Sequence, residues 1–241
     1  KHDDKYDIEV LHDDAFVISV EDGSSVALEP SYFDKTNDYP AGHREQDYFV
    51  TVQNCGVTLD ENGRKVLVTE DIRNGNGRTI KSRYSTPNRV DKIKEPIQSI
   101  FWIMKDDALP PLVKITDPRL ASILGCTLMT KRSNAENTGA GANLDALVIE
   151  PYANPFRVYP LVEDYEKFKA LFDKGVDCYI INTGDFLGKK VTKEVSLGVI
   201  ETVVDGKANF ELFGGLPGME YLPVEGYEVP EMSGDYAALI R

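Results

Sequence analysis

Short alternations of apolar and polar residues dominate the first third of the chain. Phe16–Val20 and Val26–Leu28 alternate on either side of Glu21-Asp22-Gly23, so we predict two strands joined by a turn. Tyr48–Leu59 and Lys65–Thr69 alternate around an Asn-Gly pair, which supplies the positive φ angles that a tight hairpin needs. The pattern therefore predicts two hairpins in this region.

Two polar segments are rich in turn-forming residues and are predicted to be loops. The first covers residues 29–47, between the two hairpins. The second covers residues 71–89 and holds several Asn, two Gly and four Arg, so it also concentrates positive charge.

Longer apolar runs begin near residue 97. Ile97–Met104 is apolar and rich in β-forming residues, so we predict a buried central strand. Pro110-Pro111 then forbids continuation of either helix or strand. Asp117-Pro118 predicts the start of a helix, with Asp as the N-cap and Pro in the first turn, and Gly125 is predicted to end it.

Helical spacing is clearest in the last third of the chain. Glu163–Lys174 is predicted to be a helix that Gly175 closes, and Val176–Ile181 is predicted to be the strand that follows. Thr192–Val204 is predicted to be the next helix, and the tail from Phe213 on, rich in Gly and Pro, is predicted to wrap the surface. Short strands with three or four helices predict an α+β or mixed α/β fold.

The composition limits the possible partners. The chain has 241 residues, enough for one large domain or two small ones, with an ordinary hydrophobic content of 41%. Its formal net charge of −13 disfavours binding to nucleic acid or to an anionic membrane, because both need a surplus of Lys and Arg. The longest apolar stretches, such as 99–104, are too short to span a bilayer.

The cysteines indicate the compartment. Cys55, Cys126 and Cys178 are far apart and odd in number, so neither a disulfide framework nor a zinc site is predicted. We expect a reducing, cytoplasmic setting, with thiols in apolar runs that act as small hydrophobic groups.

The richest candidate for chemistry is the stretch from residue 182 to residue 196. A strand end places Asn182, Thr183 and Gly184 at the carboxyl edge of a sheet, where ligands of α/β folds commonly bind. Lys189 and Lys190 add positive charge, and the N-terminus of the following helix adds a partial positive end. The alternative is an ordinary connection whose lysines are solvated.

Two further groups suit phosphate chemistry. Asp13 and Asp14 follow an apolar stretch, and a pair of acids at a strand end can hold Mg²⁺ or Mn²⁺, which prefer oxygen ligands. Arg73, Arg78 and Arg83 could each donate a fork of hydrogen bonds to phosphate oxygens. A charged turn and a solvated loop remain the alternatives for these groups.

Taken in order, these pieces resemble the C-terminal half of the ATP-dependent phosphoenolpyruvate carboxykinases. D-D-A-L-P-P-L-V-K-I-T (106–116) is similar to the family's D-A-F-G-V-L-P-P-V-S-K-L-T, and Y-I-I-N-T-G (179–184) is similar to its Y-L-V-N-T-G. Four shorter matches keep the family's order: G-C-T at 125–127 for G-[YF]-T, His12-Asp13-Asp14 for the end of I-G-D-D, Glu21-Asp22-Gly23 for E-G-G, and Gly75-Asn76-Gly77-Arg78 for E-N-T-R.

The resemblance implies a fold and a set of roles. Residues 1–241 would form a single carboxykinase-like C-terminal domain, cut from a longer protein whose P-loop and oxaloacetate-binding part precede Lys1. Its residues would bind ATP and Mg²⁺ or Mn²⁺. Asp14 with Asp13 would ligate the metal, and Arg78 would reach the γ-phosphate. The nucleotide would lie on the connection after the last predicted strand: Lys190, Val191 and Ser196 along adenine and ribose, next to Thr183 and Gly184.

The chain also departs from the family's motifs. C-Y-A-K after E-G-G reads S-S-V-A (24–27), so the family's lysine is missing, and Glu-Asn-Thr before Arg78 has become Gly-Asn-Gly. Three functions therefore stay open. In the first, the intact parent would convert oxaloacetate and ATP to phosphoenolpyruvate, CO₂ and ADP. Its partners would be a nucleotide, a dicarboxylate and its own N-terminal domain. Alternatively, it is a kinase or phosphatase with another acceptor, or it is a non-catalytic regulatory domain that kept the fold.

Overall fold

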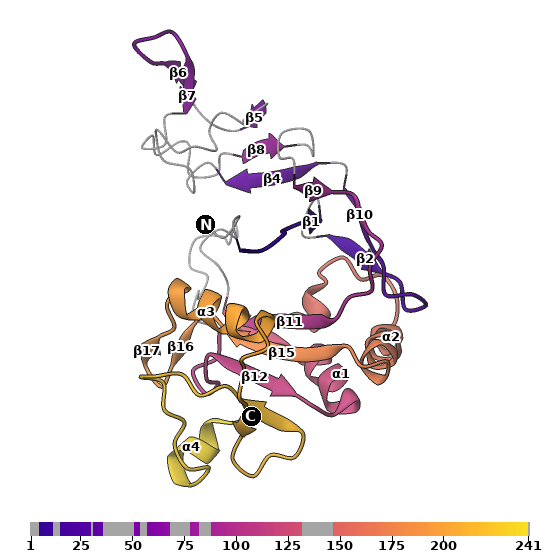
Figure 1. Cartoon of the computed structure of the whole chain (residues 1–241), viewed down its shortest axis with the longest axis vertical. Coiled ribbons are helices and arrows are strands. Elements are labelled where there is room, and N and C mark those ends of the chain that lie inside the picture. The colour runs from indigo at the N-terminus through magenta and orange to yellow at the C-terminus, as the bar shows by residue number, and fades with distance from the viewer. Residues whose placement is uncertain are drawn as a thin grey trace. The chain divides into compact units, whose positions relative to one another are not determined.

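The computed structural model describes residues 5–11, 15–29, 31–35, 51–53, 57–67, 78–81, 88–131 and 147–240 (Figure 1). Contacts within the chain divide it into two compact units, 1–96 and 97–241, and each is described by itself. The expectation of a single domain over 1–241 stays a prediction. Strands in several sheets and helices occur together, so the chain is a mixed α/β protein, compatible with the α+β class.

Short strands make up the described part of the first unit. They form sheets of order β10-β3-β2 and β4-β8-β5 and the pairs β6-β7 and β1-β9. Their bounds are β1 Val10–Leu11, β2 Phe16–Ile18, β3 Ser25–Ala27, β4 Tyr32–Lys35, β5 Thr51–Gln53, β6 Val57–Leu59, β7 Lys65–Leu67, β8 Arg78–Lys81, β9 Arg89–Val90 and β10 Lys92–Ile93.

Both predicted hairpins are present. β2 and β3 pair antiparallel across the turn at 21–23, with Val17 opposite Val26. β6 and β7 pair antiparallel around the Asn-Gly turn, where Gly63 has a φ of 75°. The Asp60 carboxylate accepts hydrogen bonds from the backbone N–H of Asn62 and Arg64, both at 2.9 Å, and these bonds fix the turn. Local turn chemistry thus decides these elements.

The prediction that both polar segments are loops was wrong in part, because each contains a strand. β4 lies inside 29–47 and β8 lies inside 71–89, and the two pair antiparallel with Phe33 opposite Ile80. β8 also pairs with β5, so its backbone is hydrogen-bonded along both edges. Pairing between distant segments therefore makes strands from sequence that looks locally like loop.

A five-stranded sheet of order β11-β15-β12-β19-β18 organises the second unit. β11 runs parallel to β15, whereas β12 is antiparallel to both β15 and β19. The strands are β11 Ser99–Met104, β12 Leu112–Ile115, β15 Asp177–Asn182, β18 Glu211–Leu212 and β19 Met219–Tyr221. Two short pairs accompany the sheet: β13 Met129–Lys131 with β14 Leu147–Ile149, and β16 Asp185–Phe186 with β17 Lys189–Lys190.

The prediction that residues 97–104 form a central strand was wrong. Among the described strands of this sheet, β11 pairs only with β15, so it lies at the edge. Its side chains alternate: Trp102 and Met104 are buried, while Ile103 is 70% exposed. β15 holds the inner place instead, and Cys178, Tyr179, Ile180 and Ile181 on it are all buried.

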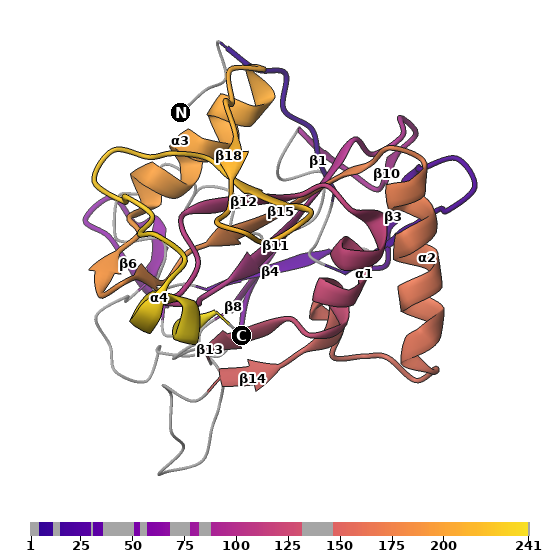
Figure 2. The same cartoon turned by 90° about the horizontal axis from the view of Figure 1, so that it is seen from below.

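Helices α1 (Pro118–Cys126) and α2 (Leu161–Asp173) pack against each other beside the sheet (Figure 2). Both were predicted. Asp117 caps α1 by accepting a hydrogen bond from the Leu120 N–H at 2.8 Å, and Gly175 follows α2 with a φ of 93°. None of the helices in the described ranges is long and apolar enough to cross a membrane.

The prediction that Gly125 ends α1 was wrong, because Gly125 lies inside the helix. A Cβ atom built at Gly125 would lie 2.4 Å from the ring of Tyr152, so the absent side chain makes room for that ring. Tyr152 belongs to a one-turn 3-10 helix, Pro151–Ala153, and stacks on Phe168 of α2 with ring centroids 4.5 Å apart. Trp102 meets both rings edge-on, which closes an aromatic core between the helices and the sheet.

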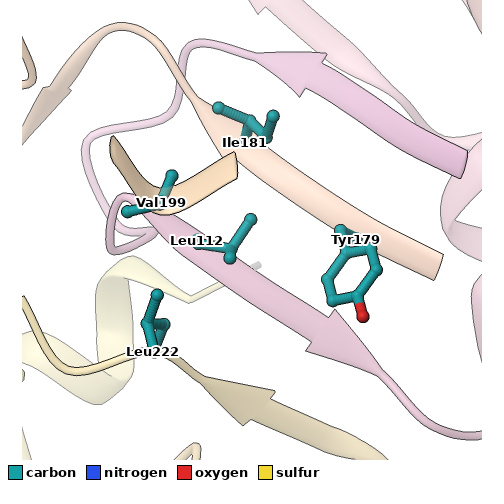
Figure 3. Close-up of a cluster of buried hydrophobic side chains, with 5 residues drawn as sticks. All are labelled: Leu112, Tyr179, Ile181, Val199 and Leu222. Carbon is teal, nitrogen blue, oxygen red and sulfur yellow. The ribbon is translucent and has the colours of Figure 1, made fainter. Parts of the chain in front are cut away.

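Helix α3 (Lys193–Val204) packs on a second hydrophobic cluster (Figure 3). Alternation along β15 puts Tyr179 and Ile181 on the face opposite Cys178 and Ile180. Leu112, Val199 and Leu222 complete the cluster, and Figure 3 shows Leu112 in the middle of the five side chains.

The C-terminal segment is part of the fold, in contrast to the predicted surface tail. Phe213 is fully buried, and β19 pairs with β12 inside the sheet. The segment continues to α4 (Gly234–Leu239), whose Tyr236 is buried. Its Gly and Pro residues therefore shape a packed connection.

Candidate functional site

The candidate site is the connection from β15 to α3. The chain leaves β15 at Asn182, forms the β16–β17 hairpin, and enters α3 at Thr192. The Thr192 hydroxyl accepts a hydrogen bond from the Val195 N–H at 3.4 Å, so it caps the helix. The predicted order of strand, glycine-bearing loop and helix is confirmed, with a short hairpin inserted between strand and helix.

Asn182 is the centre of the hydrogen bonding that shapes this connection. Its carboxamide N–H groups lie 2.7 Å from the Asp106 carbonyl, 2.6 Å from the Leu109 carbonyl and 2.9 Å from the Asp185 carbonyl. Its oxygen accepts a hydrogen bond from the Gly184 N–H at 2.9 Å. Because Asn182 is fully buried, it supports the site and does not present a group to a ligand.

Thr183 and Gly184 rest directly on the end of β11. The N–H and the hydroxyl of Thr183 both donate to the Met104 carbonyl, at 2.9 and 3.2 Å. A Cβ atom at Gly184 would lie 3.0 Å from the Cβ of Lys105, so only glycine allows this approach without a shift. The Gly184 carbonyl then accepts a hydrogen bond from the Val191 N–H at 2.9 Å, which closes the hairpin onto the strand end.

The two adjacent lysines have different partners. Lys190 is exposed, and its ammonium donates to the Thr183 carbonyl at 3.1 Å, with no carboxylate partner among the described residues. Lys189 donates to the Gly226 carbonyl, and its ammonium lies 4.5 Å from the centre of the Tyr227 ring. Lys190 therefore supplies the positive charge of this loop that is open to a ligand.

The remaining predicted contacts lie just before and inside α3. Val191 is only 3% exposed, so its side chain shapes the floor beneath the loop. Ser196 is half-buried, and its hydroxyl donates to the Thr192 carbonyl at 3.2 Å. Thr183, Gly184, Lys190 and Val191 thus lie on the connection itself, and Ser196 lies just beyond it in α3.

The formal charges of this region balance. The segments 105–111 and 182–194 hold four acidic residues and four lysines: Asp106, Asp107, Asp185 and Glu194, and Lys105, Lys189, Lys190 and Lys193. A ligand would therefore be held by directed hydrogen bonds and by the N-terminus of α3, not by a strong net field.

The other predicted site residues belong to the first unit, 1–96. Asp13 and Asp14 lie outside the described residues, as do Arg73 and Arg83. The backbone of Arg78 pairs with Lys35 and Gln53 in the first unit, and its side chain lies outside the described atoms. Within the described ranges, no group of three or more His, Cys, Asp and Glu side chains could hold a metal ion.

A groove of about 530 Å³ runs along another face of α3. Val195, Val199 and Leu222 line its apolar floor, and Lys207 and Glu225 stand at its rim. None of the five predicted nucleotide residues lines it. The groove and the predicted site are therefore separate features of the same unit.

Sequence reasoning missed three residues that shape the site: Lys105, Tyr227 and Tyr236. The hydroxyl of Tyr227 donates to the Lys190 carbonyl, and that of Tyr236 donates to the Ala108 carbonyl at 3.0 Å. For the two tyrosines, the available signal was the presence of aromatic residues in a segment rich in Gly and Pro.

The thiol of Cys178 behaves as the small hydrophobic group that was predicted, because burial raises its pKa to about 12.

The sequence matches no protein-family model and no curated protein. The likeness to ATP-dependent carboxykinases therefore rests on the short motifs and on their order along the chain.

Proposed function

We propose that this chain is the nucleotide-binding, C-terminal part of a protein similar to the ATP-dependent phosphoenolpyruvate carboxykinases. In the intact protein it would contribute metal- and ATP-binding residues to the conversion of oxaloacetate and ATP to phosphoenolpyruvate, CO₂ and ADP. The proposal assigns Mg²⁺ or Mn²⁺ to Asp13 and Asp14 and the γ-phosphate to Arg78. The metal would neutralise the charge of the phosphates.

The observation that carries the proposal is the arrangement around Lys190. Its ammonium group has no carboxylate partner among the described residues, and it stands on the connection that leads into the N-terminus of α3. An exposed cation beside a helix N-terminus suits an anionic ligand. The hydroxyls of Thr183, on this connection, and of Ser196, in α3, donate to backbone carbonyls, and each keeps lone pairs that could accept a hydrogen bond from a nucleoside.

The setting of the site supports a weak interaction for this chain alone. Four acidic side chains offset the four lysines, and the 241 residues contain no G-x-x-x-x-G-K-[ST] phosphate-binding loop. We therefore expect an affinity on the order of millimolar for adenine nucleotides.

Half-buried Cys126 and buried Cys178 are both free thiols, which supports a reducing, cytoplasmic location.

A regulatory domain without catalysis is the second candidate, and one observation favours it. Ala27 stands where the family has its lysine after E-G-G, and its N–H donates to the Asp91 carbonyl at 2.9 Å in the first unit. A methyl group there supplies neither charge nor proton. The nucleotide site would then serve binding alone, and a kinase or phosphatase with another acceptor stays the third possibility.

Amide NMR spectra of the chain, titrated with AMP to about 10 mM, test the proposal, since that concentration populates a millimolar site. We expect shifts at Thr183, Gly184, Lys190, Val191 and Ser196. Lys190→Ala should weaken the binding, whereas Lys207→Ala should not, because the ammonium of Lys207 is paired with Asp205 at 2.9 Å. Spectra that stay unchanged over 182–196 would rule out a nucleotide site here.

A further inference from the structure

The C-terminal segment holds the hairpin that carries Lys190. The hydroxyl of Tyr227 donates a hydrogen bond to the backbone carbonyl of Lys190, and Tyr227 is only 6% exposed. The neighbouring Lys189 reaches back to the Gly226 carbonyl and places its ammonium 4.5 Å from the Tyr227 ring centre. A Cβ atom at Gly226 would lie 2.6 Å from that ammonium, so a larger residue there would push the flexible end of Lys189 aside.

The same segment is attached a second time near its end. The hydroxyl of Tyr236 donates to the Ala108 carbonyl at 3.0 Å, and its ring meets Phe186 of β16 edge-on with centroids 6.3 Å apart. Ala108 belongs to the loop that Asn182 ties to the strand end. Figure 1 shows the yellow C-terminal ribbon passing β16 and β17 on its way to α4.

We propose that Tyr227 is a positioning residue of the nucleotide site, acting through Lys190. The inference rests on the proposed function and extends it. The hydroxyl of Tyr227 fixes the Lys190 carbonyl, and this bond sets the turn by which the chain passes from β17 to the Thr192 cap. The Lys190 ammonium is thereby held over the Thr183 carbonyl, where a nucleotide would meet it. Tyr227 itself does not contact the nucleotide.

The Tyr227 hydroxyl donates a hydrogen bond to one acceptor, the Lys190 carbonyl. The Lys190 carbonyl faces away from the ladder between β16 and β17 and is partly buried, so loss of its donor leaves it poorly satisfied. The hairpin is only two residues long on each side, so its position depends on contacts with its surroundings, and the Tyr227 bond is one of them. Tyr227→Phe keeps the ring beneath Lys189 and removes only this bond, which makes it the sharpest variant.

Two measurements on the whole chain test the assignment. The first is hydrogen exchange at the Val191 amide, which reports how firmly the hairpin is closed. We expect exchange about tenfold faster in Tyr227→Phe and unchanged in Tyr221→Phe, whose hydroxyl bonds to Glu211 instead. Equal exchange in the Tyr227→Phe variant and the wild type would overturn the assignment. Lys189→Met removes the second contact between the hairpin and this segment, and we expect it also to speed exchange at Val191.

The second measurement is AMP affinity from amide NMR, followed through a double-mutant cycle. Tyr227→Phe should weaken binding by about threefold to tenfold in the wild type and by nothing in the Lys190→Ala background. A purely structural role would give the same loss in both backgrounds and would overturn the inference. If the wild type itself shows no AMP-dependent shifts, the proposed function fails and this assignment fails with it. If wild type and Tyr227→Phe bind AMP equally, only the inference fails.

Discussion

The carboxamide of Asn182 lies 2.6 Å from the carbonyl oxygen of Leu109, a residue 73 positions earlier in the chain. Through this bond and its neighbours, one buried side chain ties the loop between β11 and β12 to the connection between β15 and α3. The polar atoms of Asn182 are satisfied by backbone groups, which explains how a polar side chain is tolerated with no exposed surface.

We expect Asn182→Asp to lower the free energy of unfolding by about 3 kcal/mol or to prevent folding, because a carboxyl group would face three carbonyl oxygens. Urea denaturation measures the loss. Asn209→Asp is the matched control, since Asn209 is exposed and makes a single long hydrogen bond of 3.5 Å. A loss under 1 kcal/mol at position 182 would mean that the network contributes little.

Replacement of two helical glycines by alanine should change the free energy of unfolding in opposite directions. A Cβ at Gly125 would overlap the Tyr152 ring, which is packed by Trp102 and Phe168, so Gly125→Ala should destabilise the protein by about 1–3 kcal/mol. A Cβ at Gly198 would meet no atom within 4 Å, so Gly198→Ala should stabilise it by about 0.5–1 kcal/mol. Thermal denaturation of the two variants checks the pair. Changes of the same sign would contradict the packing described here.

The turn between β2 and β3 should lose stability at acid pH. A hydrogen bond with Ser19 and then bonds from Ser24 lower the pKa of the exposed Asp22 carboxyl to about 2. Because this value lies below the unfolded pKa of about 3.9, the carboxylate stabilises the turn above about pH 4, and the effect is lost as pH falls toward 2. Carboxyl-carbon NMR should find a midpoint near 2, and Asp22→Asn should remove the pH dependence. A midpoint near 3.9 would exclude these bonds in solution.

Arg78 should distinguish ATP from ADP in a longer protein that contains this chain and supplies the phosphate-binding loop. We expect Arg78→Ala to weaken ATP binding about tenfold and to leave ADP binding nearly unchanged, because its assigned partner is the γ-phosphate. Calorimetry with both nucleotides measures the ratio. Arg64→Ala is the control, since Arg64 is paired with Asp60 in the β6–β7 hairpin at 2.9 Å. Equal losses for ATP and ADP would remove Arg78 from this role.

Local signals predicted the elements that local chemistry decides. The Asp117 cap, the Asn-Gly turn and the helical spacing of α2 each depend on a few adjacent residues, and each prediction was confirmed. The place of β11 at the edge and the strands β4 and β8 depend on pairing with distant segments. Sequence periodicity carries no information on such pairing, so these predictions were wrong.

The same division holds for the candidate site. The residues from Thr183 to Ser196 could be grouped in advance because they are neighbours in sequence. Tyr227 and Tyr236 could not, because they reach Lys190 and Ala108 across 37 and 128 positions. The place of Lys190 on this connection follows from the sequence, whereas its contact with the C-terminal segment became visible only in the structure.

The inner position of β15 has a consequence for synthesis of the chain. β11 and β12 do not pair with each other, and each takes β15 as its neighbour in the sheet. A ribosome therefore makes both strands long before Asp177 emerges to join them. During that interval the apolar runs Ser99–Met104 and Leu112–Ile115 lack the neighbours that they have among the described strands, and such edges invite association between nascent chains. Chains ending before residue 177 should therefore depend on chaperones, and those extended past residue 182 should depend on them less.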